Sequence, residues 1–281
     1  MKNILIPTDF SENSWNALKY ALVFFKNNEC DFYLLHVTLI YNYASAESPI
    51  APYPAIDVLD KAVLKQAKTK LKKLIEKIDQ LPPNPKHKFY TLNNYDYFID
   101  GVRSQVHEKN IDLIVMGTKG ATGLKKVMMG SNTGDLLTRV KCPILIVPEN
   151  AEFKNIKEIA FPTDYNMFYP TKILNNILEF TKMHDSSLRI LHIINEYEEV
   201  TGFQIENKEF LNAFFEDEKH SFHKITNKKI EDGVQSFVES RDIDMIIMIA
   251  KNLNLFQRIL FRPTVEQISY HTDVPFLVLH E

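Results

Sequence analysis

The chain has 281 residues, of which 45% are hydrophobic and 25% charged, and its formal net charge is −3. This length favours two domains of ordinary size, and the charge argues against a nucleic-acid binder that relies on a basic face. No apolar run approaches the eighteen residues of a membrane span, and the N-terminus carries no signal-peptide pattern. Because Cys30 and Cys142 are far apart in apolar contexts, we expect a cytoplasmic protein with two buried thiols.

Strand-like and helix-like segments alternate along the chain. In the first half, short apolar runs predict strands at 2–7, 31–37, 87–92, 111–116 and 143–148. Between them, helices are predicted at 13–27, 56–80, 96–109 and 131–140. In the second half, strands are predicted at 157–162, 187–193, 220–226, 243–249 and 275–280. Strands separated by helix-length connections imply an α/β fold in which each half is a doubly wound parallel sheet with helices on both faces.

The second half of the chain repeats the first. The matching segments are Pro7-Thr8-Asp9 with Pro162-Thr163-Asp164, Leu35-His36 with Leu191-His192, and Asp112 to Met116 with Asp244 to Met248. A short polar link follows the last predicted strand of the first half. We therefore predict two domains, residues 1–150 and 151–281.

Five of the eight glycines lie between Gly117 and Gly134. Since glycine lets a ligand approach the bare backbone, the cluster predicts a loop shaped around a ligand. The loop follows a predicted strand and precedes a predicted helix, for which Ser131 is the expected N-cap. This layout binds phosphate, because free N–H groups and the positive end of the helix dipole both point at the anion.

The spacing of this loop, in which Gly117 is followed by Gly120 and then by Gly130-Ser131, fits neither a Walker A loop nor the Rossmann fingerprint. It resembles the ATP-binding signature of the universal stress protein family. The initial segment Ile4 to Asp9 and the closing segment Pro143 to Pro148 also resemble that family. Because the pattern occurs twice, the resemblance covers essentially the whole chain. It implies two repeated five-stranded, adenine nucleotide α-hydrolase-like sheets.

The resemblance also implies a nucleotide site in the first half. Asp9 and Val37 would contact the adenine, although Asp9 has an alternative role as a cap or turn residue. The full set assigned to the nucleotide is Pro7, Thr8, Asp9, Val37, Met116, Gly117, Gly120, Gly130, Ser131, Asn132 and Thr133. The implied cofactor is ATP, with ADP or AMP as alternatives. No carboxylate cage for Mg²⁺ is evident, so a magnesium ion would be held mainly by phosphates and water.

The second half lacks the glycine motif. At the matching positions Gly117 becomes Ile249, and Gly130-Ser131 becomes Arg262-Pro263. Proline removes an N–H donor that a phosphate needs, and a side chain at a former glycine fills the space of the nucleotide. We therefore expect a degenerate second domain that binds no nucleotide.

These features favour an ATP-binding sensor or regulator of the stress response. A slow ATPase or phosphotransfer enzyme using the same pocket is an alternative, although no base that could orient water is evident. A nucleotide-free interaction scaffold is another. Each half ends in an apolar strand, at 144–147 and 276–279, and an unpaired edge of this kind invites another strand. In the family that the halves resemble, the last strands pair across a dimer interface, so the resemblance implies that these two strands pair antiparallel within the chain. The sequence leaves open whether two chains form a homodimer. Neither a nucleic acid nor a membrane is an expected partner.

Overall fold

The computed structural model describes residues 1–38, 53–118, 131–195, 199–250 and 273–280. Within these ranges the chain forms ten strands and seven helices. The strands are β1 (Lys2–Pro7), β2 (Cys30–Thr38), β3 (His87–Tyr95), β4 (Leu113–Gly117), β5 (Ile144–Val147), β6 (Glu158–Pro162), β7 (Ser187–Ile194), β8 (His220–Thr226), β9 (Met245–Ile249) and β10 (Phe276–Leu279). The helices are α1 (Glu12–Phe24), α2 (Tyr53–Ile78), α3 (Phe98–Glu108), α4 (Ser131–Arg139), α5 (Thr171–His184), α6 (Gly202–Phe214) and α7 (Ile230–Ser240). Every predicted strand and helix is present.

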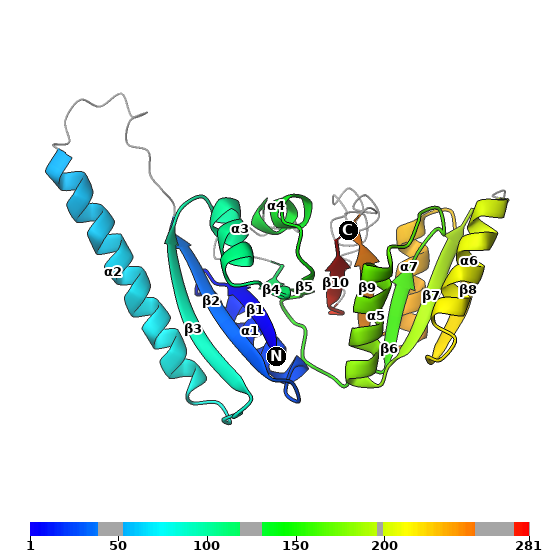
Figure 1. Ribbon diagram of the computed structural model, residues 1–281, viewed down its shortest axis with the longest axis horizontal. Coiled ribbons are helices and arrows are strands. Elements are labelled where there is room, and N and C mark those ends of the chain that lie inside the picture. Colours follow the sequence, from blue (N-terminus) through cyan, green and yellow to red (C-terminus); the bar gives the residue numbers. More distant parts are fainter. Residues whose placement is uncertain (39–52, 119–130, 196–198, 251–272, 281) are drawn as a thin grey trace.

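All ten strands belong to one sheet with the order β3-β2-β1-β4-β5-β10-β9-β6-β7-β8 (Figure 1). Neighbouring strands are parallel within each half, and the two halves have mirrored strand orders. The halves meet where β5 and β10 pair antiparallel, with Phe276 opposite Ile146 and Leu277 opposite Leu145. The expected antiparallel pairing is confirmed. It joins the two predicted sheets into one mixed sheet, because each half ends in a buried apolar strand whose backbone groups need a partner.

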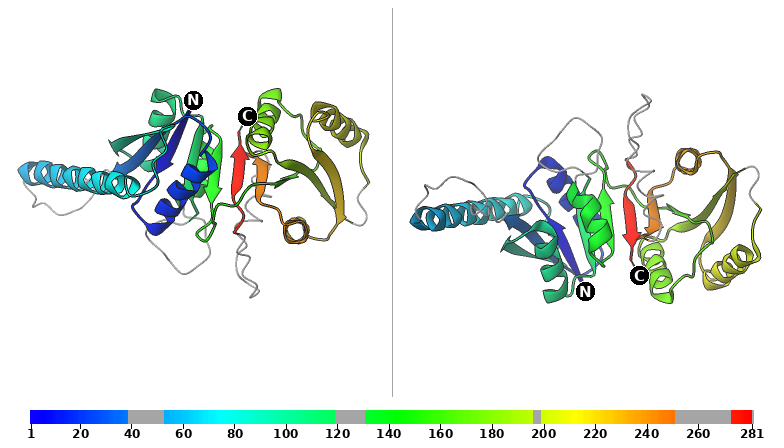
Figure 2. Two further views of the ribbon diagram at one scale, coloured as in Figure 1. Left: turned by 90° about the horizontal axis from the view of Figure 1, so that it is seen from below. Right: turned by 90° about the horizontal axis from the view of Figure 1, so that it is seen from above.

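Helices cover both faces of this sheet, as Figure 2 shows in both halves. On one face, Ile4 and Ile6 of β1 belong to an apolar layer that includes residues of α1, α2 and α5. On the other face, Leu5 belongs to a layer that includes residues of α3, α4 and α7. The two layers follow from the strand itself, because successive side chains of a strand point to opposite faces. A fully apolar strand such as β4 or β9 is therefore buried on both sides.

Side-chain contacts reinforce the junction between the halves. Lys2 Nζ lies 2.6 Å from Glu179 Oε1, which ties β1 to α5. Asn16 Nδ2 of α1 donates a hydrogen bond of 3.0 Å to the carbonyl oxygen of Ala151 in the connecting segment. His280, after β10, contacts the carbonyl oxygen of Leu137 in α4 at 2.8 Å through Nε2. These contacts hold the second half against the first beyond the sheet itself.

His184, the last residue of α5, lies at this junction and should make the protein sensitive to acid. Its ring centroid is 4.4 Å from that of Phe24, and its buried Nε2 has no hydrogen-bond partner among the described residues. Burial, with Lys26 and Lys157 nearby, lowers the pKa of His184 from its ordinary 6.5 to about 4. Between these pH values the unfolded chain binds a proton that the folded chain does not. Stability should therefore fall by about 3 kcal/mol as the pH drops from 6.5 to 4.

The measurement is chemical denaturation at pH values from 7 to 4, with the variant His184→Leu beside the unaltered chain. The variant should lose this share of the pH dependence and keep the smaller share of His87, His223 and His280, whose pKa values burial also lowers. The matched control is His107→Leu, which removes a histidine from an exposed position of α3 and leaves His184 in place, so the pH dependence due to His184 should remain. An unaltered pH dependence in His184→Leu would contradict the assignment.

Candidate functional site

The candidate site is built on the carboxyl ends of adjacent strands. β1 lies between β2 and β4, and the strand order reverses direction between β1 and β4. The N–H of Thr8 donates to the carbonyl oxygen of Leu35 at 2.8 Å, so the chain leaving β1 stays attached to β2. In doubly wound sheets such a switch point is where ligands bind. The structure thus brings together three sequence-predicted segments, ending at Asp9, Val37 and Gly117.

The turn after β1 is held by its own side chains. Thr8 Oγ1 accepts a hydrogen bond from the N–H of Phe10 at 3.0 Å and lies 3.0 Å from Ser14 Oγ. Asp9 is exposed, and its Oδ1 accepts hydrogen bonds from the N–H of Ser11 at 3.0 Å and from Ser11 Oγ at 2.6 Å. Ser11 then caps α1 by accepting from the N–H of Ser14. Asp9 therefore fills the turn role that the sequence left open as its alternative.

The ends of β2 and β4 are closely packed. Val37 contacts Gly101 of α3, where an added Cβ would lie 3.2 Å from Val37 Cγ2. Met116 is buried. At Gly117 a Cβ would lie 3.1 Å from the carbonyl oxygen of Asn13, a tight contact that α1 could accept only by shifting slightly away from the end of β4. Gly117 therefore has a packing reason of its own, apart from any ligand.

The helix that would receive the phosphates is α4. Ser131 is the first described residue of α4 and is already helical, which corrects the expectation that Ser131 is the cap before the helix. Buried Leu136 and Leu137 anchor α4 in the second apolar layer. Of the remaining predicted phosphate residues, Asn132 is exposed and Thr133 is 2% exposed. Gly120 and Gly130 lie outside the described residues.

The second half keeps the turn of the first. The N–H of Thr163 donates to the carbonyl oxygen of Leu191 at 2.9 Å, and the N–H of Asn166 donates to Asp164 Oδ1 at 2.9 Å. Tyr165, in the place of Phe10, also has a left-handed backbone, with φ of 57° against 65°. The aromatic residue of this turn was missed as a candidate, although it directly follows the repeated Thr-Asp pair. Of the positions that replace the glycine motif, Ile249 is buried at the end of β9, and Arg262 and Pro263 lie outside the described residues.

Both cysteines are buried, and neither forms a disulfide. Burial raises the pKa of the Cys30 thiol to about 11 and that of the Cys142 thiol to about 12. The thiolate is the reactive form, so these groups are poor nucleophiles at neutral pH. Within the part of the chain that the structure describes, no three histidine, cysteine or acidic residues gather into a metal site. None of the described helices is long and apolar enough to cross a membrane.

Comparison with known proteins agrees with the resemblance seen in the sequence. The model of the universal stress protein family matches residues 1–148 and again residues 155–280. The chain is 29% identical over 157 residues to Universal stress protein MJ0531 of Methanocaldococcus jannaschii, covering 52% of this chain and 81% of that protein. It is 25% identical over 147 residues to Universal stress protein YxiE of Bacillus subtilis, covering 51% of this chain and 97% of that protein.

Among solved structures, a universal stress protein from Archaeoglobus fulgidus matches the fold over 99% of this chain and 98% of its own, with a TM-score of 0.69 and 18% identity. That likeness concerns the fold. Together with the two matches of the family model, it accounts for both halves of the ten-stranded sheet. The chain therefore belongs to the universal stress protein family and carries two of its domains in tandem.

Proposed function

We propose that the protein is an ATP-binding regulator or sensor of the stress response, in which the first half, residues 1–150, holds the nucleotide. The observation that carries the proposal is the order strand, glycine-rich segment and helix N-terminus from β4 to α4, at the switch point of the sheet. Backbone N–H groups at the start of α4 would donate to the phosphates. Val37 and Met116 offer apolar contacts to the adenine and ribose from neighbouring strand ends.

The two halves would have different roles. Residues 151–281 form the degenerate partner domain, because Arg262-Pro263 stands where the first half has Gly130-Ser131. The second half would brace the first by covering the edge of β5. ATP would therefore bind with one site per chain, accompanied by Mg²⁺ only through phosphates and water.

The test replaces Ser131 in the full chain. Proline is tolerated at the first position of a helix but lacks the N–H, so Ser131→Pro keeps α4 and removes one donor to the phosphates. We expect ATP to bind about 10–100-fold more weakly, the value of a hydrogen bond to a charged group. The pair Gly130→Arg and Ser131→Pro copies the second half and should abolish binding. Isothermal titration calorimetry measures both affinity and stoichiometry.

The matched control is Ser131→Ala, which loses the hydroxyl but keeps the N–H and should cost less affinity than Ser131→Pro. Thermal unfolding of each variant checks that the fold is intact. Unchanged ATP affinity in Ser131→Pro would show that the site is placed wrongly. Absence of binding in the unaltered chain would favour the scaffold alternative, and rapid turnover of labelled ATP would favour the enzyme.

A further inference from the structure

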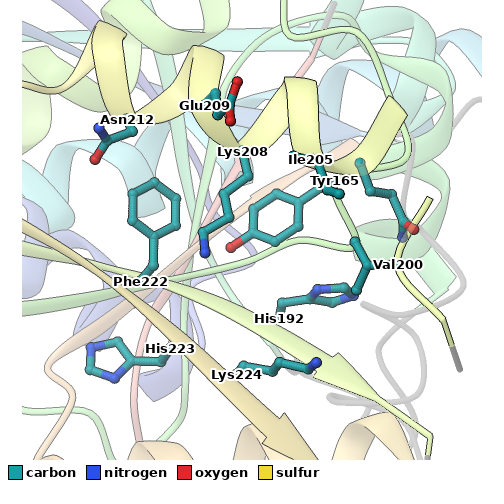
Figure 3. Close-up of a pocket in the computed structure, with 11 residues that line it drawn as sticks. Tyr165, His192, Val200, Ile205, Lys208, Glu209, Asn212, Phe222, His223 and Lys224 are labelled. Carbon is teal, nitrogen blue, oxygen red and sulfur yellow. The ribbon is translucent and has the colours of Figure 1, made fainter. Parts of the chain in front are cut away.

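A cavity of about 590 Å³ lies in the second half, between α6 and the sheet at β7 and β8 (Figure 3). His192 of β7 pairs with Lys224 of β8 in the register of the two strands, so both lie on one face of the sheet. The neighbouring Ile193, which matches Val37 of the first half, lies on the opposite face with α7. The cavity therefore lies on the opposite face of the sheet from the side chain that matches Val37.

Aromatic rings form one wall of the cavity. The ring of Tyr165 lies 4.9 Å from that of His192 at an angle of 79°, and 6.4 Å from that of Phe222. The backbone at Tyr165 is fixed from α6, because Asn207 Nδ2 donates to its carbonyl oxygen at 2.8 Å. A further anchor is Gln204 Nε2, which donates to the carbonyl oxygen of Asp164 at 2.7 Å. The rings thus stand in a fixed arrangement, in which Tyr165 and His192 are almost fully buried and Phe222 is half-buried beside the cavity.

The hydroxyl of Tyr165 has no partner within the described residues. The Tyr165 residue is 3% exposed and lines the cavity, whereas the nearby Tyr169 hydroxyl contacts Thr163 Oγ1 at 2.5 Å. Burial raises the pKa of Tyr165, so its hydroxyl is a neutral donor at physiological pH. The matching residue of the first half is Phe10, whose ring lies 4.6 Å from that of His36 at an angle of 40°. The second half therefore adds a hydroxyl donor to an otherwise repeated ring pair.

Two lysines bring positive charge to the same cavity. Lys208 extends from α6 toward Tyr165 and Phe222 in Figure 3, and its Nζ lies 5.3 Å from the centre of the Phe222 ring. Neither Lys208 nor Lys224 forms an ion pair with a described carboxylate. Glu209 supplies the one carboxylate among the described residues lining the cavity, and it is rotated about 100° from Lys208 around the helix. Among the described residues, the site thus combines a hydroxyl donor, aromatic surface and two lysines against one carboxylate.

We propose that this cavity binds a small aromatic carboxylate. The ring of the ligand would lie against the half-buried Phe222, beside the parts of Tyr165 and His192 that line the cavity. Its carboxylate would accept from the Tyr165 hydroxyl and lie near Lys208 and Lys224. The volume is within the range of about 300–1,000 Å³ of small-molecule sites. The proposal is independent of ATP binding in the first half.

The experiment uses the full chain and three probes that separate the features. By isothermal titration calorimetry, 2-naphthoate should bind saturably with one site per chain. The neutral 2-naphthamide, which keeps the rings, and cyclohexanecarboxylate, which keeps the charge, should each bind at least about tenfold more weakly. Each of Lys208→Met and Lys224→Met should weaken 2-naphthoate about threefold, as expected for exposed charges. Tyr165→Phe, which restores the residue type of the first half, should weaken it about tenfold.

The matched control is Lys88→Met, at an exposed position of β3 in the first half, which should leave 2-naphthoate binding unchanged. ATP titrated into the 2-naphthoate complex should not displace the probe. Absence of saturable 2-naphthoate binding would overturn the proposal. So would equal affinity for 2-naphthamide, full affinity in the double variant Lys208→Met with Lys224→Met, or displacement by AMP, which would assign the cavity to nucleotides instead.

Discussion

Replacing Phe24 by alanine should lower the free energy of unfolding by about 3–5 kcal/mol, the usual cost of deleting a buried phenylalanine ring. Phe24 ends α1 and is 2% exposed. Its ring is 6.3 Å from that of Phe153 in the connecting segment, and 6.0 Å from that of Phe180 in α5. The alanine variant would therefore leave a cavity at the junction between the halves, where α1 and α5 share one apolar layer.

Urea denaturation followed by circular dichroism measures this loss. The matched control is Phe203→Ala in α6, where the phenylalanine is 37% exposed and should contribute less than about 1 kcal/mol. A loss below 1 kcal/mol in Phe24→Ala would mean that the junction repacks without cost. Because the ring touches both halves, the unfolding transition of the variant should also show whether the halves still unfold together.

Cutting the chain between the halves should produce two fragments that associate. The fragment 1–150 would expose the edge of β5, and the fragment 151–281 would expose the edge of β10. Both edge strands are wholly apolar, with exposures of at most 1% in the full chain. An unpaired edge of this kind offers backbone N–H and C=O groups to any other strand. Each fragment alone should therefore self-associate or aggregate at about 10–100 µM.

Mixing the fragments is the matched control, because each one then supplies the antiparallel partner of the other. Sedimentation velocity should show a one-to-one complex that replaces the self-associated species. The ion pair between Lys2 and Glu179 crosses the cut, so Lys2→Ala should weaken the complex only slightly. A stable monomer of residues 1–150 at these concentrations would contradict the idea that the second half covers a strand edge that would otherwise self-associate.

Much of the candidate site could be predicted because its residues lie at the ends of apolar strands. Periodicity placed Asp9, Val37 and Gly117 at strand ends, and parallel strands bring such ends to one edge. The predicted start of α4 at residue 131 agrees with the structure, but Ser131 was assigned as the cap, because the ends of helices depend on backbone hydrogen bonds that composition does not reveal. The roles predicted for Asp9 and Gly117 were also incomplete. The bond from Ser11 to Asp9 and the close approach of Asn13 to Gly117 exist only in the folded chain.

Local pattern alone determined the alternation of strands and helices, the internal repeat, and the apolar character of the closing strands β5 and β10. These features are given by the order of residues along the chain, so they do not depend on contacts that form only in the folded protein. Only the tertiary structure decided the register of the pairing between β5 and β10, in which Leu277 lies opposite Leu145. The same is true of the cavity beside Tyr165, which depends on how α6 lies over β7 and β8. Contacts between distant segments depend on packing, and packing selects among arrangements that local periodicity leaves equally good.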